Sequence, residues 1–243
     1  MGHGTPDWWG GAPKSTTYAL GDMAELAVRL GSIVSFDRRG DVIWYDDFRD
    51  GIGKFAVAGS GTGTDVWPVG AYGMYRGLAV NLHTGTLTGN ASGIDKVVHY
   101  PVLGGIGLEC SFVPHWQQLN QRLCCLVYDG TNVYRYQVRY DQTTGKVEAF
   151  HSDGAWYTLG TPGVQRTGYT AYTTMKMVFD CLAVKHVRVL FNGATYVSSA
   201  YAPTVDVDAT AKSMELFIYA FTSVDAAIDV TVGSVILTQN EPV

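Results

Sequence analysis

From residue 48 onward, apolar and polar residues alternate in short runs that are separated by turn sequences. Such alternation is typical of strands that bury one face, because successive side chains of a strand point to opposite sides. The runs recur at about the spacing of an all-β sandwich. We therefore expect strands at residues 54–58, 74–82, 95–100, 105–113, 122–128, 132–140, 145–150, 173–181, 185–191, 194–198, 213–222 and 227–238.

Glycine-containing pairs mark the turns between several of these runs. Asp129-Gly130, Thr144-Gly145 and Asp153-Gly154 each separate two alternating segments. Asp-Gly in this position is a strong hairpin signal, because glycine adopts the positive φ that tight hairpin turns require. A further hairpin is expected over residues 32–48, around the turn sequence DRRGD.

Residues 1–17 show neither a helical nor a strand period and read as an arm. The arm contains the adjacent pair Trp8 and Trp9. Leaving two indole rings in water costs about 25 cal/mol for each Å² of apolar surface. We therefore expect the arm to dock on a neighbouring subunit.

One short helix is expected after the arm, within LGDMAELAVRLG. Asp22 can cap its first turn, and Met23, Leu26 and Leu30 form one apolar stripe. A helix of this length is marginal alone in water, so its stripe must pack on something. The expected organisation is an anchoring and assembly segment over residues 1–40, followed by a sandwich over residues 41–243.

The composition indicates a sparsely charged surface. Asp, Glu, Lys and Arg make up 16% of the chain, against a usual share of about 25%. A surface with so little charge is expected where other subunits cover part of it, so we predict a homo-oligomer. The basic residues are scattered, which disfavours nucleic-acid binding.

Membrane insertion and export are not expected. No apolar run approaches the roughly 20 residues that a membrane-spanning helix needs. The first residues lack the basic-then-apolar order of a signal peptide. The four cysteines lie in apolar segments without C-x-x-C spacing, so we expect free thiols and synthesis in a reducing cytoplasm.

Three segments resemble concanavalin A-like and laminin-G-like jelly rolls. They are TMKMVFDCLAVKHVRVLFNGATYVSS at 174–199, YDDFRDGIGKF at 45–55 and AAIDVTVGSVILTQ at 226–239. The resemblance implies an all-β, concanavalin A-like jelly-roll β-sandwich, here with an N-terminal arm and one short helix. It also implies that the first and last strands pair beside each other.

Residues 16–48 resemble the start of structural proteins of tailed bacteriophages, in which an arm and a helix precede a lectin-like sandwich. This resemblance implies a virion component, such as a capsid decoration, tail or fibre protein, that is made in the host cytoplasm. Its partners would be copies of itself and other virion proteins.

Jelly rolls of this kind also include glycoside hydrolases and polysaccharide lyases, so a catalytic site is the alternative to a binding role. Two carboxylates on one face of one strand require a spacing of two or four residues. The pairs with this spacing are Asp46 and Asp50, Asp206 and Asp208, and Asp225 and Asp229. None lies in the E-x-D-x-E pattern of laminarinase-type enzymes, the arginine and histidine strand patterns of alginate lyases are missing, and no G-x-S-x-G occurs. The sequence therefore predicts a protein that is not an enzyme, with a hydrolase or lyase as the less favoured alternative.

No cofactor is required by any motif, but the resemblance implies a structural calcium ion. In related carbohydrate-binding jelly rolls it lies between the first and last strands, at positions that match Asp46, Asp47 and Asp229. Oxygen ligands of this type suit calcium. The alternative is that these carboxylates only bond to the backbone of their own turns.

Aromatic residues near polar ones are candidates for stacking on sugar rings. The residues that qualify by type are Trp67, Tyr72 and Tyr75 within DVWPVGAYGMYRG, Trp116 beside Gln117 and Gln118, and Trp156 with Tyr157. Core or interface packing is the alternative for each. The leading hypothesis is a non-enzymatic virion structural protein that assembles through Trp8, Trp9 and the helix stripe and displays a lectin-like sandwich toward host glycans. The alternative is a free-standing carbohydrate-binding lectin or module.

Overall fold

The computed structural model describes residues 39–70, 78–115, 119–165, 167 and 172–243. Several sequence-predicted residues lie outside these ranges and carry no structural account: Trp8, Trp9, Met23, Leu26, Leu30, Tyr72, Tyr75 and Trp116. The expected arm and helix, and the first arm of the hairpin expected over 32–48, fall outside them as well. The described residues are all-β, which confirms the predicted fold class.

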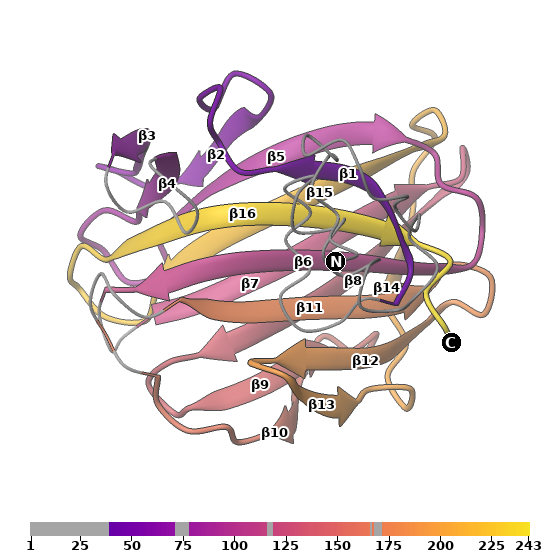
Figure 1. The fold of residues 1–243 in the computed structure, drawn as a ribbon. Coiled ribbons are helices and arrows are strands. Elements are labelled where there is room, and N and C mark those ends of the chain that lie inside the picture. Colours follow the sequence, from indigo (N-terminus) through magenta and orange to yellow (C-terminus); the bar gives the residue numbers. More distant parts are fainter. Residues whose placement is uncertain (1–38, 71–77, 116–118, 166, 168–171) are drawn as a thin grey trace, which may run out of the picture. The chain divides into compact units, whose positions relative to one another are not determined.

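The strands form two antiparallel sheets (Figure 1). The first sheet has the order β13 (Ala194–Val197), β12 (Lys185–Phe191), β11 (Thr173–Asp180), β6 (Gly105–Pro114), β16 (Asp229–Gln239), β4 (Leu78–His83) and β3 (Asp65–Gly70), with β1 (Asp41–Asp46) also paired to β16. The second has the order β10 (Trp156–Gly160), β9 (Lys146–Phe150), β8 (Asn132–Asp141), β7 (Leu119–Tyr128), β15 (Ser213–Thr222), β5 (Ala91–His99) and β2 (Ala56–Ser60), with β14 (Thr204–Val207) on β8.

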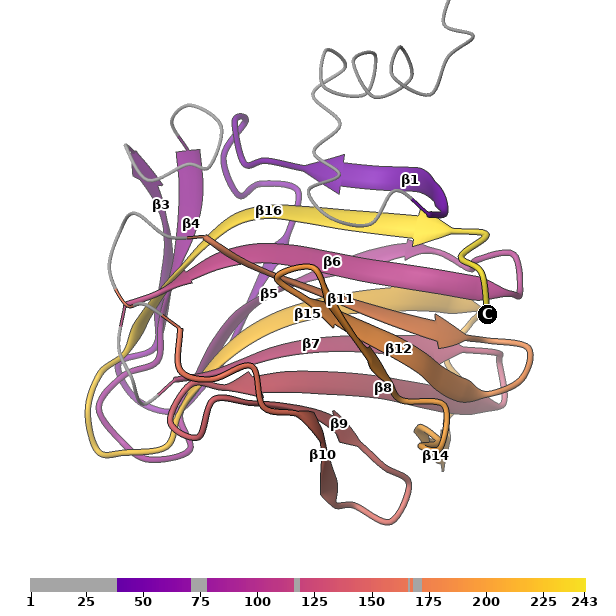
Figure 2. The same cartoon turned by 60° about the horizontal axis from the view of Figure 1, so that its bottom comes forward.

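The two sheets are the layers of a sandwich, as Figure 2 shows from below. The side chains that alternate toward the interior form one hydrophobic core. Aromatic rings join the layers across it: Tyr136 of β8 stacks on Phe179 of β11 with 4.2 Å between ring centroids. Tyr140 of β8 likewise packs on Phe191 of β12 at 4.4 Å. The buried apolar area of both sheets therefore stabilises a single unit.

The first and last strands pair, as the resemblance implies. Asp41 lies opposite Gln239 and Asp46 opposite Val235, and Figure 1 shows β1 running alongside the yellow β16. Asp46 ends β1 because its Oδ1 accepts a hydrogen bond of 2.7 Å from the backbone N–H of Phe48. Phe48 then turns the chain with a φ of 60° and is fully buried.

The segment after β16 is fastened by buried charges. Glu241 accepts from the amine of Lys176 on β11 at 2.6 Å and from the guanidinium of Arg188 on β12 at 2.7 Å. The hydroxyl of Thr238 donates to the same carboxylate at 2.6 Å. Glu241 is 3% exposed and Lys176 2%, so the attraction acts in a poorly solvated environment.

Most predicted strands are present. β3 and β14 were missed, and β10 was expected only from the hairpin turn at Asp153-Gly154. β3 contains Pro68, which disfavours a strand prediction, but β3 is the edge strand of its sheet and proline is tolerated there. β14 has four residues and pairs only with β8. Edge strands of this kind have too few alternating positions to be recognised from sequence.

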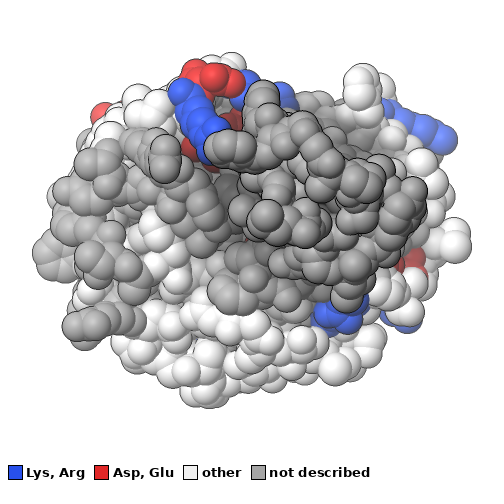
Figure 3. All heavy atoms as spheres, in the orientation of Figure 1, with Lys and Arg blue, Asp and Glu red and all other residues white. Residues whose placement is uncertain are grey.

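The sparse charge predicted from composition is visible on the surface. In Figure 3 the described atoms are mostly white, and acids and bases occupy only a few places on that side. Within the described ranges, the chain has no helix of the length and apolar character needed to cross a membrane.

Candidate functional site

The structure places the two described glycan-binding candidates on opposite sheets. Trp67 of β3 lies on the outside of the first sheet, where its ring is 5.7 Å from that of His83. Trp156 of β10 lies on the second sheet, 5.0 Å from the ring of Phe150. The two tryptophans therefore do not contribute to one site.

The three predicted calcium ligands are also not brought together. Asp229, at the start of β16, accepts a hydrogen bond from Asn81 Nδ2 at 2.8 Å and lies 2.9 Å from His83 Nδ1. Asp46 of β1 is opposite Val235 of β16. Val235 is six residues beyond Asp229 on β16, so Asp46 and Asp229 are separated by roughly 20 Å along the strand, at about 3.3 Å per residue. The carboxylate of Asp47 forms an ion pair of 2.6 Å with Arg49.

A shared calcium site of Asp46, Asp47 and Asp229 therefore does not fit this geometry. Calcium needs six to eight oxygens around one point, whereas these carboxylates occupy different ends of the β1 and β16 pair. Among the described residues, no group of three or more His, Cys, Asp or Glu side chains is placed to hold a metal ion.

The outer side of the second sheet carries a different set of polar and aromatic side chains. Alternation along β15 sends Leu216, Ile218 and Ala220 into the core, so the residues between them point outward. The same rule applies to the neighbouring strands. We call this surface the aromatic face and define it by Asp95, Arg122, Arg139, Glu148, Trp156, Glu215, Phe217, Tyr219 and Phe221.

Three aromatic rings follow one another along β15. The rings of Phe217 and Tyr219 are 5.3 Å apart and nearly parallel, at 16°, and Tyr219 meets Phe221 edge-on at 5.7 Å. Gly93 of β5 lies opposite Tyr219, and a Cβ at Gly93 would be 2.2 Å from the Tyr219 ring. The glycine thus lets the tyrosine ring lie flat across β5. All three rings are half-buried, so each exposes part of its surface.

A row of polar residues crosses the sheet from the central tyrosine. Tyr219 is opposite Arg122 of β7, Arg122 is opposite Arg139 of β8, and Arg139 is opposite Glu148 of β9. Arg139 Nε and Glu148 Oε2 form an ion pair of 2.6 Å. Thr158 of β10 donates to the other carboxylate oxygen at 3.3 Å.

Arg122 lies between two aromatic rings. Its guanidinium carbon is 3.6 Å from the ring centroid of Phe221 and 5.2 Å from that of Trp156, which are cation–π distances. Burial, and after it the positive charge of Arg139, lowers the pKa of Arg122 to about 10. No described residue accepts a hydrogen bond from its Nε.

Two carboxyl groups stand beyond the aromatic row. Asp95 of β5 is opposite Phe217, and Glu215 is opposite Val97, so the two are diagonal neighbours whose Cα atoms lie about 7 Å apart. Burial raises the pKa of Asp95. Burial, and after it the charge of Asp95, raises the pKa of Glu215, which the phenol of Tyr128 partly offsets.

Of the aromatic face, only Trp156 was predicted from the sequence. A signal was present, because Phe217, Tyr219 and Phe221 alternate with aliphatic residues, which makes the segment apolar on both sides. The aliphatic residues of β15 already supply the core, so aromatic side chains on its outward face indicate an interaction surface. Asp95 and Glu215 carry no such signal, since they come from separate segments.

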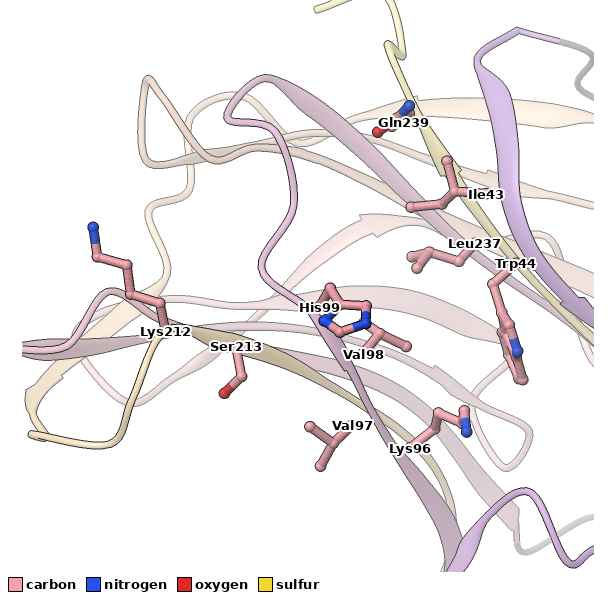
Figure 4. A pocket seen from close by; sticks show the side chains of 10 residues that line it. All are labelled: Ile43, Trp44, Lys96, Val97, Val98, His99, Lys212, Ser213, Leu237 and Gln239. Carbon is pink, nitrogen blue, oxygen red and sulfur yellow. The ribbon is translucent and has the colours of Figure 1, made fainter.

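A groove of about 650 Å³ lies between the edges of the two sheets. Ile43 and Trp44 of β1, Val98 of β5 and Leu237 of β16 line its apolar part. Figure 4 shows Lys96 beside Trp44, with Lys212 at the far end. The Lys96 amine already donates to the Lys54 carbonyl at 2.9 Å, and the lining has no carboxylate. The groove therefore offers fewer groups for a polar ligand than the aromatic face.

No protein-family model and no curated protein matches the sequence. Solved structures do match. The apo Crh5 transglycosylase is 13% identical, with a TM-score of 0.50, over 84% of this chain and 88% of that one. A carbohydrate esterase of the Shiga toxin-encoding bacteriophage phi24B is 15% identical, with a TM-score of 0.48, over 82% and 98%. TmCBM61 in complex with beta-1,4-galactotriose is 11% identical, with a TM-score of 0.40, over 76% and 88%.

The match to the apo Crh5 transglycosylase shows a shared fold, a jelly-roll sandwich. Because that fold carries an enzyme, the match contradicts the prediction that the chain is not an enzyme. The prediction rested on carboxylate pairs within one strand. It did not consider carboxylates on neighbouring strands, such as Asp95 and Glu215, which are adjacent only because β5 and β15 pair.

Proposed function

We propose that the aromatic face binds an oligosaccharide. The observation that carries this proposal is the half-exposed row of Phe217, Tyr219 and Phe221, continued by Trp156 across the sheet. Aromatic rings offer flat apolar surfaces for the faces of sugar rings. The arginines and carboxylates between them supply the directional hydrogen bonds that orient a polyhydroxylated ligand.

The dimensions of the face suit an extended ligand. From β15 to β10 the face spans four strand intervals, which is roughly 19 Å at about 4.8 Å each. The rings and the polar row lie on rigid strands of a packed sandwich, so little order has to be gained on binding. A short oligosaccharide crossing the strands would contact Tyr219, Arg122 and Trp156 in turn.

The test is binding by the purified full-length chain to an array of neutral and acidic oligosaccharides, followed by titration calorimetry with the best ligand. Tyr219→Ala should weaken binding about tenfold or more, because one stacked ring is removed. Tyr157→Ala is the matched control, since this exposed tyrosine stacks on Tyr201 outside the aromatic face. Equal loss in both variants, or no glycan bound by the parent chain, would argue against the proposal.

The second candidate function is cleavage of a glycosidic bond by Asp95 and Glu215. Two carboxyl groups about 5–10 Å apart are what glycoside hydrolysis needs, one of them kept protonated by a raised pKa. Burial raises the pKa of both groups in this structure. Release of reducing ends from a bound glycan, abolished in Glu215→Gln and in Asp95→Asn while binding persists, would establish it. Turnover that is unchanged in both variants would exclude this pair.

The virion location and the homo-oligomer are further proposals, supported by the resemblance of residues 16–48 and by the low charge of the chain. Mass photometry of the full-length protein and of a chain lacking residues 1–30 tests the assembly. A defined oligomer that becomes a monomer on truncation supports it. A monomer in both cases would leave oligosaccharide binding as a property of a single chain.

A further inference from the structure

The aromatic face contains an unusual pair of like charges. Arg122 and Arg139 lie directly opposite each other on β7 and β8. Like charges in this position destabilise a sheet. A folded chain tolerates them where a negative charge lies between or beside them.

The carboxylate beside the pair balances only one of the two arginines. Glu148 is bound to Arg139 Nε at 2.6 Å, and its other oxygen accepts from Thr158. Within the described residues, the next acid along β8, Asp141, accepts hydrogen bonds from Thr143 and Thr144 of its own turn. Glu215 lies on the far side of Phe217 from Arg122 and neighbours Tyr128. Arg122 is thus left with no carboxylate of its own among the described residues.

The surroundings of Arg122 make the lack of a counter-ion energetically unfavourable. Its guanidinium is enclosed by Phe221 and Trp156, at 3.6 and 5.2 Å from the ring centroids. A desolvated cation without a counter-ion is unfavourable, whereas the same cation binds an incoming anion strongly. The flat guanidinium presents its N–H groups in a fork that matches a carboxylate or a sulfate.

We propose that the ligand of the aromatic face is an acidic oligosaccharide, whose anionic group is bound between Arg122 and Arg139. The inference rests on the proposed oligosaccharide binding and names the class of sugar. Trp156 and Tyr219 border the two arginines, so a ring that carries the anionic group can stack while that group meets the guanidinium fork. A carboxylate on a uronic acid and a sulfate ester share this chemistry.

Matched ligand pairs test the proposal on the full-length chain. Calorimetric titrations use an oligogalacturonate against its methyl ester, and a sulfated galactan oligosaccharide against its desulfated form. The acidic member of at least one pair should bind about tenfold tighter or more, the gain expected from charge-assisted hydrogen bonds. Its affinity should fall as the ionic strength rises. The pair that shows the difference identifies the anionic group as carboxylate or sulfate.

Substitution of Arg122 tests whether this arginine causes the preference for acidic ligands. Arg122→Gln should remove about tenfold or more of the preference for the acidic ligand over its neutral partner, because the acidic ligand loses a charge-assisted hydrogen bond that the neutral one never makes. Arg49→Gln, at an arginine outside the aromatic face, should leave this preference unchanged. Should Arg122→Gln not fold, the comparison of acidic and neutral ligands with the unaltered chain still decides the question.

The outcomes separate the two proposals. Equal binding of acidic and neutral members would overturn the acidic ligand and leave oligosaccharide binding intact. Acid-selective binding that is insensitive to Arg122→Gln would overturn the role of the arginines. No binding of any oligosaccharide, acidic or neutral, would overturn the proposed function itself.

Discussion

His186 of β12 lies edge-on to Tyr136 of β8, with 5.6 Å between ring centroids and 75° between the rings. The imidazole is fully buried. Burial lowers the pKa of His186 to about 4, and the nearby backbone of Phe150 opposes this only in part. The sandwich therefore holds this histidine in its neutral form.

Stability should consequently fall in mild acid. The unfolded chain takes up a proton at His186 near pH 6.5, whereas the folded chain resists until about pH 4. The contribution of neutral His186 to the free energy of unfolding is fully present above about pH 6.5. It is lost progressively as the pH falls toward 4, and the total loss is up to about 3 kcal/mol. Urea unfolding at pH 7.5 and pH 5 should show this loss in the parent chain and a smaller one in His186→Leu. An identical pH dependence in both would refute the assignment.

Removing the carboxylate of Glu241 should destabilise the sandwich. Glu241→Gln leaves the buried amine of Lys176 and the guanidinium of Arg188 without their shared counter-ion, at a cost of about 3–5 kcal/mol. Denaturant unfolding followed by tryptophan fluorescence measures it. Asp50→Asn, which removes an exposed partner of Lys54, is the control and should cost less than about 1 kcal/mol.

Gly93→Ala should disturb the aromatic face. The added Cβ would lie 2.2 Å from the Tyr219 ring and 2.6 Å from the Ile218 carbonyl oxygen, so the ring must move. We expect a loss of about 1–3 kcal/mol in stability together with weakened glycan binding. Gly53→Ala, where the new atom meets nothing within 4 Å, should leave both unchanged. Unaltered binding by Gly93→Ala would mean that Tyr219 does not act from this position.

Asp95→Asn should lower the pKa of Glu215. The negative charge of Asp95 is the second cause, after burial, that raises this pKa, and asparagine removes it. Carboxyl-carbon NMR titration of Glu215 in both chains measures the change without any substrate. A Glu215 titration unaffected by Asp95→Asn would show that the two groups do not interact.

The strands could be predicted because their information is local. Asp129-Gly130 and Asp153-Gly154 adopt positive φ at their glycines, as expected from the pair alone. The alternation of β15 likewise follows from neighbouring residues in one segment. Pairing of β1 with β16 needed the resemblance, because no local pattern connects residues at the two ends of the sandwich.

The site could not be predicted in the same way, because its geometry depends on which strands are neighbours. Arg122 faces Arg139 through the β7 and β8 hairpin, but Tyr219 reaches Arg122 only because β15 lies between β5 and β7. Asp95 and Glu215 are adjacent for the same reason. The predicted calcium ligands show that strand pairing alone is not enough. Asp46 and Asp229 belong to paired strands but lie far apart along them.

The pairing of Asp41 with Gln239 has a consequence for attachment. Both ends of the sandwich leave from neighbouring strands of the first sheet, whereas the aromatic face is the outer side of the second. A scaffold joined at either end of the sandwich is therefore connected through the sheet that does not carry the aromatic face. Attachment through the first sheet would leave the aromatic face, the proposed binding surface, exposed to solvent. A fusion partner at residue 243 should therefore leave any glycan affinity of that face unchanged.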